Sequence, residues 1–74
     1  MLFHHGKHQK MTMIRVMQCN TNRSRAAHDL LENTLQTRGY SVCAVSEPNR
    51  ARVVGSHWDV DVKGDVAIWT SKEV

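Results

Sequence analysis

Two oxygen-bearing side chains follow the two apolar runs of the sequence, at the points where those runs end. Asn20 comes directly after the run at residues 13–19, and Glu47 comes directly after the run at residues 41–46. If the runs are neighbouring parallel strands about 4.8 Å apart, both side chains lie at the sheet edge where open α/β sheets collect ligands. Amide and carboxylate oxygens suit Mg²⁺ or Mn²⁺, which bind one or two such groups together with water and substrate phosphate. The pattern therefore predicts a divalent metal site at Asn20 and Glu47.

The same residues also have a purely structural interpretation. Asn20 and Asn22 are typical helix-capping residues, because their side-chain oxygens accept hydrogen bonds from the first amides of a following helix. Glu47 precedes Pro48, where a solvated turn carboxylate is common. The residues alone leave both interpretations open.

Basic side chains lie in the same two segments. Guanidinium groups bind phosphate bidentately, although exposed arginines also serve as ordinary surface. The formal net charge is +3, and no acidic residue precedes Asp29, so the N-terminal part of the chain favours a polyanion such as nucleic acid. The arginines beside the two polar residues are Arg23, Arg25, Arg50 and Arg52.

A strand, a helix and a second strand are needed to position these groups. The apolar run at 13–19 is short and contains β-branched residues, which favours a buried strand. Residues 25–38 repeat apolar side chains at helical spacing, and Gly39 suits the end of a helix. Asn22 or Ser24 can cap the first amides of this helix. With the valine-containing strand at 41–46, the order is a βαβ unit, whose two strands run parallel. The side chains on the predicted buried face of the helix are Ala27, Leu30, Leu31, Thr34 and Leu35.

A β-hairpin is predicted after an irregular segment at residues 49–57. The even positions 58, 60, 62, 66 and 68 are apolar, whereas positions 59, 61 and 65 carry aspartates. With residues 63–65 as a three-residue turn, the pattern stays in phase across the hairpin. This places Val62 opposite Val66 and Val60 opposite Ile68, with Ala67 and Trp69 on the other face.

The remaining features of the sequence narrow the class of protein and its expected location. Residues 1–12 have no periodicity and are expected to form a disordered leader before a single domain at 13–74. His4 and His8 have the spacing of a helical metal pair, although Gly6 weakens such a helix. Two cysteines without a metal or disulfide spacing indicate reduced, buried thiols. With no apolar stretch near 20 residues and no signal peptide, we expect an intracellular, nuclear or cytoplasmic protein that is neither secreted nor bound to a membrane.

Three segments together resemble the N-terminal part of the endonuclease domain of non-LTR retrotransposons. They are IRVMQCNTNRSRAAHDLL, GYSVCAVSEPNR and GDVAIW. In this branch of the endonuclease/exonuclease/phosphatase family, the first strand ends in a QxNxNRS-like motif, the second strand ends in EP, and a later strand carries AIW or AxxW. The resemblance covers residues 13–70.

The resemblance implies half of a four-layered α/β sandwich that hydrolyses DNA phosphodiesters with Mg²⁺ or Mn²⁺, in a domain associated with a reverse transcriptase. It assigns catalytic and metal-binding roles to Asn20 and Glu47. Relatives often carry an aromatic residue after EP that helps hold the DNA, whereas this chain has Asn49, which offers no face for base stacking. The nucleic-acid contacts implied are Asn22, Arg23, Arg25, Asn49 and Arg50.

The catalytic histidine and further aspartates and asparagines of the family lie in a second half without a counterpart in these 74 residues. We therefore expect a truncated endonuclease fragment that is inactive alone, with an exposed sheet face open to self-association or to the missing half. One alternative is a small basic, non-catalytic module that binds nucleic acid through Arg15 and the four arginines above. Another is a fragment that folds only with a partner.

Overall fold

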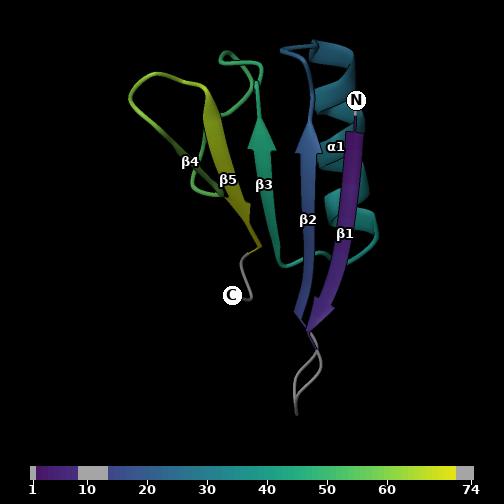
Figure 1. The fold of residues 1–74 in the computed structure, drawn as a ribbon. Helices are drawn as coiled ribbons and strands as arrows, with labels where there is room; N and C mark the ends of the chain where they lie inside the picture. The colour runs from purple at the N-terminus through teal and green to yellow at the C-terminus, as the bar shows by residue number, and fades with distance from the viewer. Residues whose placement is uncertain (1, 9–13, 72–74) are drawn as a thin grey trace.

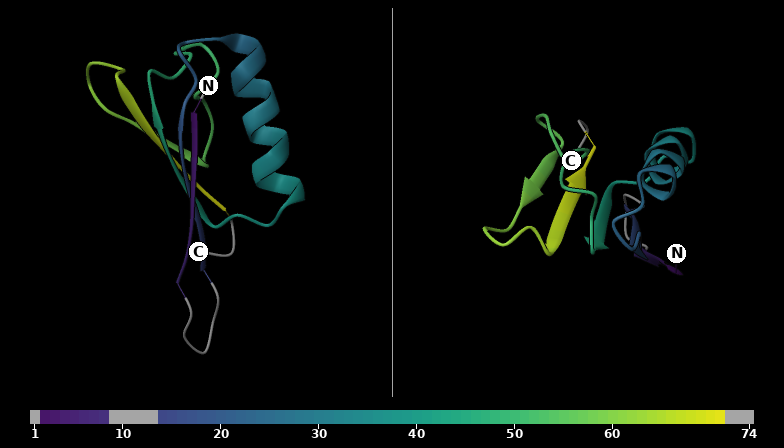
Figure 2. Two further views of the ribbon diagram at one scale, coloured as in Figure 1. Left: turned by 45° about the vertical axis from the view of Figure 1, so that its right-hand side comes forward. Right: turned by 90° about the horizontal axis from the view of Figure 1, so that it is seen from above.

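The computed structural model describes residues 2–8 and 14–71, which form one mixed α/β unit. The sheet has the order β1-β2-β3-β5-β4, and the helix packs against one of its faces (Figures 1 and 2). The elements are β1 (Leu2–His8), β2 (Ile14–Asn20), α1 (Arg25–Thr37), β3 (Val42–Ser46), β4 (Trp58–Val60) and β5 (Val66–Thr70).

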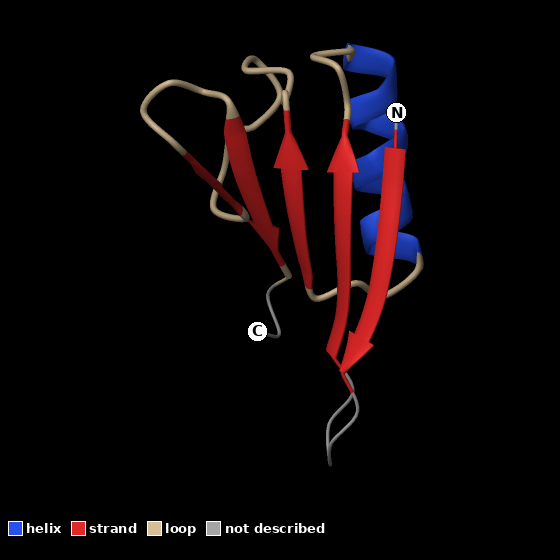
Figure 3. Cartoon of the chain, in the orientation of Figure 1, coloured by secondary structure: helices blue, strands red, loops and turns tan. Residues whose placement is uncertain are grey.

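The predicted βαβ unit is present. Strands β2 and β3 are parallel neighbours, and α1 connects them (Figure 3). Ser24 is the N-cap of α1, and its hydroxyl accepts a hydrogen bond from the amide of Ala27 at 3.1 Å. Gly39 has a φ of +68°, the left-handed conformation that ends many helices. The strand and helix boundaries lie within one or two residues of those predicted.

The core lies between α1 and the sheet. Leu31 and Leu35 of the helix are fully buried, and so is His28. The helix is rotated relative to the prediction, because Leu30 is 56% exposed while His28 faces the sheet. His28 is accommodated by a ring contact with Trp58, with centroids 5.2 Å apart. The sheet contributes Met17, Cys19, Cys43, Val45, Trp58, Ala67 and Trp69 to this core.

Strand β1 corrects the prediction of a disordered leader. Residues 2–8 pair antiparallel with the outer edge of β2, from Leu2 opposite Asn20 to His8 opposite Ile14. Backbone hydrogen bonds to an open strand edge need no apolar periodicity, so residues 2–8 carry no local pattern that predicts this strand. Because the segment is a strand, the helical spacing of His4 and His8 does not arise. Residues 1 and 9–12 of the predicted leader lie outside the described residues.

The hairpin forms, but its register differs by one residue from the prediction. Val60 pairs with Ala67 rather than with Ile68, and Trp58 pairs with Trp69. The loop is longer than predicted because Asp61 begins it, accepting backbone hydrogen bonds from Gly64 on its carbonyl and from Asp65 on its side chain. As a result, both tryptophans face the helix and the core.

The opposite face of the sheet has no described helix or strand packed over it (Figure 2). Its side chains alternate with those of the core, and Ile14 and Val66 are 42% and 44% exposed. This surface, which we call the bare face, carries the apolar side chains of Ile14, Val16, Val42, Ala44, Val66 and Ile68.

Among the described residues, no helix has the length and apolar character needed to cross a membrane.

Candidate functional site

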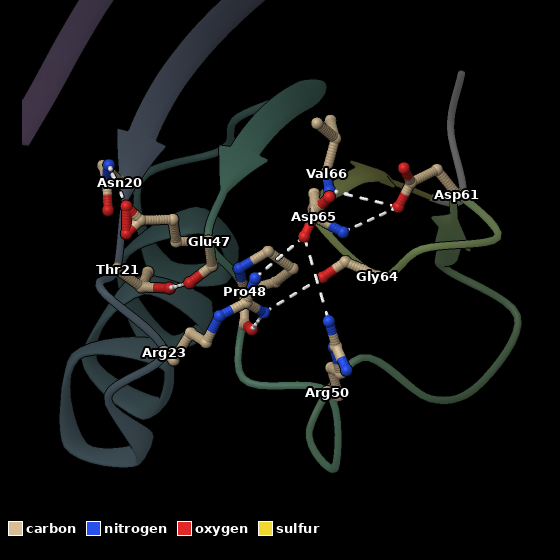
Figure 4. Close-up of polar contacts among 10 residues, drawn as sticks. All are labelled: Asn20, Thr21, Arg23, Glu47, Pro48, Arg50, Asp61, Gly64, Asp65 and Val66. Atoms are coloured by element: carbon tan, nitrogen blue, oxygen red, sulfur yellow. Dashed lines mark hydrogen bonds and ion pairs between the residues drawn. The ribbon is translucent and has the colours of Figure 1, made fainter.

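The side chains of Asn20 and Glu47 meet at the ends of the two parallel strands. In the β2–β3 register, Asn20 lies opposite Ser46, the residue before Glu47. The Nδ2 group of Asn20 donates a hydrogen bond to Oε1 of Glu47 at 3.5 Å (Figure 4). The Glu47 side chain is exposed, so its carboxylate is accessible to a ligand from solvent.

The orientation of the Asn20 amide is set by its own loop. Its Oδ1 atom accepts a hydrogen bond from the backbone amide of Asn22 at 2.8 Å, so the Nδ2 group faces Glu47. Asn20 therefore contacts the carboxylate as a donor, while its side-chain oxygen, which was predicted to bind a metal, already accepts the hydrogen bond from Asn22. The Glu47 carboxylate is the oxygen group of this pair that stays accessible. Of the predicted capping residues, Ser24 is the N-cap of α1, and Asn20 and Asn22 do not cap it.

The backbone of Glu47 is held by hydrogen bonds at both its carbonyl and its amide. Its φ is +48°, a left-handed conformation that is unfavourable for a residue with a long side chain. The carbonyl of Glu47 accepts hydrogen bonds from Thr21 Oγ1 at 3.0 Å and from the amide of Arg23 at 2.7 Å. The amide of Glu47 donates to the carbonyl of Asp65 at 3.0 Å. These contacts fix the direction in which the Glu47 side chain leaves the loop.

Thr21 and Asp65 are parts of the site that the sequence interpretation missed. Thr21 is fully buried although it is polar, and its role depends on the loop after β3, which is distant in the sequence. Asp65 was expected only in a hairpin turn. A threonine following a strand and an aspartate in a turn have no spacing that would have indicated these contacts.

Arg23 and Asn49, both predicted to contact nucleic acid, are occupied within the fold. The guanidinium of Arg23 donates to the carbonyls of Pro48 and Gly64 at 3.2 and 3.1 Å and to the carboxylate of Asp65 at 2.9 Å (Figure 4). The Nδ2 group of Asn49 donates to the carbonyl of Arg23 at 3.0 Å. Both side chains therefore join loops that are far apart in the sequence.

The other residues that were predicted to contact nucleic acid are more exposed to solvent. The Arg50 side chain is 63% exposed and lies 3.8 Å from Asp65, a weak ion pair (Figure 4). Asn22 is exposed in the loop before the helix, and Arg25 is exposed at the first residue of the helix. Arg52 lies 3.5 Å from Asp29 on α1. Arg25 and Arg50 are thus the predicted arginines with the most freedom to meet a phosphate.

The ionisable groups near the site have distinct environments. The pKa of the Asp61 carboxyl is lowered, chiefly by the hydrogen bond from the amide of Val66 and further by that from Asp65. Burial raises the pKa of Cys19, and burial next to Cys19 raises the pKa of Cys43 to about 12. Both thiols therefore stay protonated at neutral pH, which agrees with the prediction of reduced, buried cysteines.

The oxygen donor that this site offers to a cation is the single carboxylate of Glu47. Among residues 14–71, no cluster of three or more histidines, cysteines, aspartates or glutamates is arranged to hold a metal ion. One carboxylate is nevertheless within the range that Mg²⁺ accepts from a protein when water and substrate phosphates complete its coordination. A pocket on the bare face next to this site is lined by Gln18, Cys19, Asn20, Ala44, Val45, Ser46 and Val66, and Glu47 is not among its lining residues.

No family model matches the chain, and comparisons with curated proteins and with solved structures also gave no match. The described residues define a small mixed α/β domain with polar groups collected at the carboxyl ends of β2 and β3.

Proposed function

We propose that this chain supplies one side of the active site of a Mg²⁺- or Mn²⁺-dependent DNA endonuclease of the non-LTR retrotransposon type, and that it does not cleave DNA alone. The observation that carries the proposal is the contact between Asn20 and Glu47 at 3.5 Å. An accessible carboxylate held by an amide at the ends of parallel strands suits a hard cation that also binds a phosphate.

In this proposal Glu47 holds the metal and Asn20 orients the carboxylate. The bound cation would polarise a phosphate and support the attacking and leaving oxygens of a phosphodiester. Arg50 and Arg25 would contact backbone phosphates, since their guanidinium groups are exposed. Arg23 and Asn49 are left out of this phosphate contact, because their side chains are held by hydrogen bonds within the fold.

The proposed lack of cleavage follows from the number of groups that the site brings together. Glu47 is the one carboxylate in direct contact with Asn20, and the described residues bring no histidine into hydrogen-bonding contact with this pair. Hydrolysis needs a group that activates water as well as one that holds the metal. In this proposal a second wall of the site, supplied by residues outside the described site, would provide these groups.

The metal site is tested by NMR spectroscopy of the chain with Mn²⁺. We expect paramagnetic broadening to appear first at the amides of residues 20–22 and 46–48 and to be abolished by Glu47→Gln. Asp59→Asn is the matched control, because Asp59 is an exposed carboxylate on the distant edge strand. Broadening that is centred elsewhere, or that persists in Glu47→Gln, would show that this metal site does not exist.

The lack of activity is tested separately with supercoiled plasmid DNA and Mg²⁺. We expect no nicking above the background of the Glu47→Gln variant. Nicking that Glu47→Gln abolishes would overturn the proposed inactivity while supporting the metal site.

A second candidate function, non-catalytic binding of nucleic acid, is favoured by the 63% exposure of the Arg50 side chain. Such binding would be insensitive to EDTA and would weaken steeply with salt, because it depends on the release of counterions from phosphates. Fluorescence anisotropy with a labelled DNA duplex, with and without EDTA, separates it from metal-dependent binding. In that assay the endonuclease proposal expects binding that increases with Mg²⁺ and is reduced in Glu47→Gln.

A further inference from the structure

Arg23 connects three loops that the sequence keeps far apart. It belongs to the β2–α1 loop (residues 21–24) and reaches the loop after β3 (residues 47–57) through the Pro48 carbonyl. It reaches the β4–β5 loop (residues 61–65) through Gly64 and Asp65. Figure 4 shows the guanidinium lying between these two loops.

The same residue also contacts Glu47 through its backbone. The amide of Arg23 donates to the carbonyl of Glu47 at 2.7 Å, and the amide of Glu47 donates to the carbonyl of Asp65 at 3.0 Å. Asp65 in turn accepts the hydrogen bond from the Arg23 guanidinium at 2.9 Å. Arg23, Glu47 and Asp65 therefore form a closed set of contacts around the metal-binding residue.

We propose that Arg23 is a positioning residue for Glu47, held in place by Asp65, and that it is not a phosphate ligand. This inference rests on the proposed function, because it assigns to Glu47 the role of metal ligand. The left-handed φ of Glu47 makes the direction of its side chain dependent on these contacts. Residues that orient a metal ligand contribute strongly to metal affinity even though they do not touch the metal.

The planar fork of arginine explains why this position carries arginine. Three acceptors are reached from two nitrogens, because Nη1 donates to Pro48 and Gly64 while Nη2 donates to Asp65. A lysine ammonium carries the same charge but lacks this fixed geometry. If Arg23 bound phosphate, lysine at this position would keep part of the DNA affinity, because the charge is the same. If Arg23 positions Glu47 through three acceptors, lysine would not keep that role.

The experiment compares Arg23→Lys, Asp65→Asn and their double variant, with Arg38→Lys as the matched control at the far end of α1. The first measurement is amide hydrogen exchange at Glu47, which does not depend on any metal. The second is Mn²⁺ affinity, measured at a temperature where circular dichroism shows every variant to be folded. DNA affinity is measured in parallel at fixed salt.

We expect Arg23→Lys to raise the exchange rate of the Glu47 amide about tenfold, as for the loss of one charge-assisted hydrogen bond. Mn²⁺ affinity should fall about tenfold, the lower end of the range for residues that orient metal ligands. Asp65→Asn should act in the same direction, and the double variant should be no weaker than Arg23→Lys, because both changes break the same set of contacts. Arg38→Lys should match the wild-type protein.

Unchanged exchange at Glu47 in Arg23→Lys would overturn the proposal. So would tighter DNA binding in Asp65→Asn, because that result would mean that breaking the ion pair frees Arg23 to contact phosphate. If the wild-type protein shows no Mn²⁺ binding at Glu47, the proposed metal site fails together with the positioning role, while the exchange data still report whether Arg23 holds the loop. If Mn²⁺ binds and Arg23→Lys leaves its affinity unchanged, only the positioning role is overturned.

Discussion

Glu32 provides a sharp test of how the helix is attached to the sheet. One carboxylate oxygen accepts the indole N–H of Trp58 at 3.2 Å, and the other lies 3.2 Å from Nε2 of the fully buried His28. Glu32→Ala leaves the Trp58 donor, on a residue only 8% exposed, without this acceptor. An unsatisfied buried donor costs about 1–3 kcal/mol.

The Glu32 side chain is 33% exposed, so water can partly replace the carboxylate after truncation. We therefore expect a loss of about 2 kcal/mol in the free energy of unfolding, in the middle of that range. For a domain of this size, such a loss lowers the melting temperature by roughly 8–16 °C. Near-ultraviolet circular dichroism and tryptophan fluorescence both measure the transition, because Trp58 and Trp69 lie in the core.

Glu32→Gln is the control for this experiment. The glutamine oxygen can still accept the indole N–H, so we expect this variant to lose less than about 1 kcal/mol. The interpretation of the Glu32 contacts is wrong if Glu32→Ala unfolds within 2 °C of the wild-type protein. It is also wrong if the two variants are equally destabilised, because the hydrogen bond to Trp58 would then have no separate effect.

Three further predictions concern other parts of the domain. Thr21→Val removes the hydroxyl that donates to the Glu47 carbonyl and should cost about 1 kcal/mol in urea denaturation, because a second donor to that carbonyl remains; a stabilised variant would contradict this. Backbone hydrogen bonds lower the pKa of Asp61 from its ordinary value of 3.8, so its ionised form favours the folded state, and stability should fall as the pH drops from that value through the lower folded-state pKa. Asp61→Asn should reduce this acid-induced loss, and identical pH profiles for the two proteins would refute the assignment. Burial raises the pKa values of Cys19 and Cys43, so neither thiol should react with a thiol reagent at pH 8 until the protein is denatured; rapid labelling of the native protein would show that they are accessible.

The βαβ unit could be predicted because each of its signals is local. Helical spacing, a capping serine and Gly39 mark the helix, and short apolar runs mark the two strands. The meeting of Asn20 and Glu47 then follows from the parallel arrangement of those strands, since the carboxyl ends of parallel neighbours lie at one edge. The sequence was sufficient here because the local patterns and the topology agree.

The parts that could not be predicted depend on contacts between distant segments. Strand β1 is fixed by pairing with the edge of β2, which leaves no pattern in its own residues. The hairpin register is decided by the hydrogen bonds of Asp61, and moving the pairing by one residue moves alternate side chains to the opposite face. The inward direction of Arg23 depends on Asp65, 42 positions further along the chain. An arginine that joins loops and one that meets solvent have the same local sequence signature.

The bare face has a practical consequence for every stability measurement proposed above. Two copies that associate through this face would bury apolar surface in the folded state only, so association would raise the melting temperature as protein concentration increases. A melting temperature that is constant over a hundredfold range of concentration would identify a folded monomer with a solvated apolar sheet. A rising value would mean that the stability of the domain is defined only together with its concentration, and that variants should be compared at a single concentration.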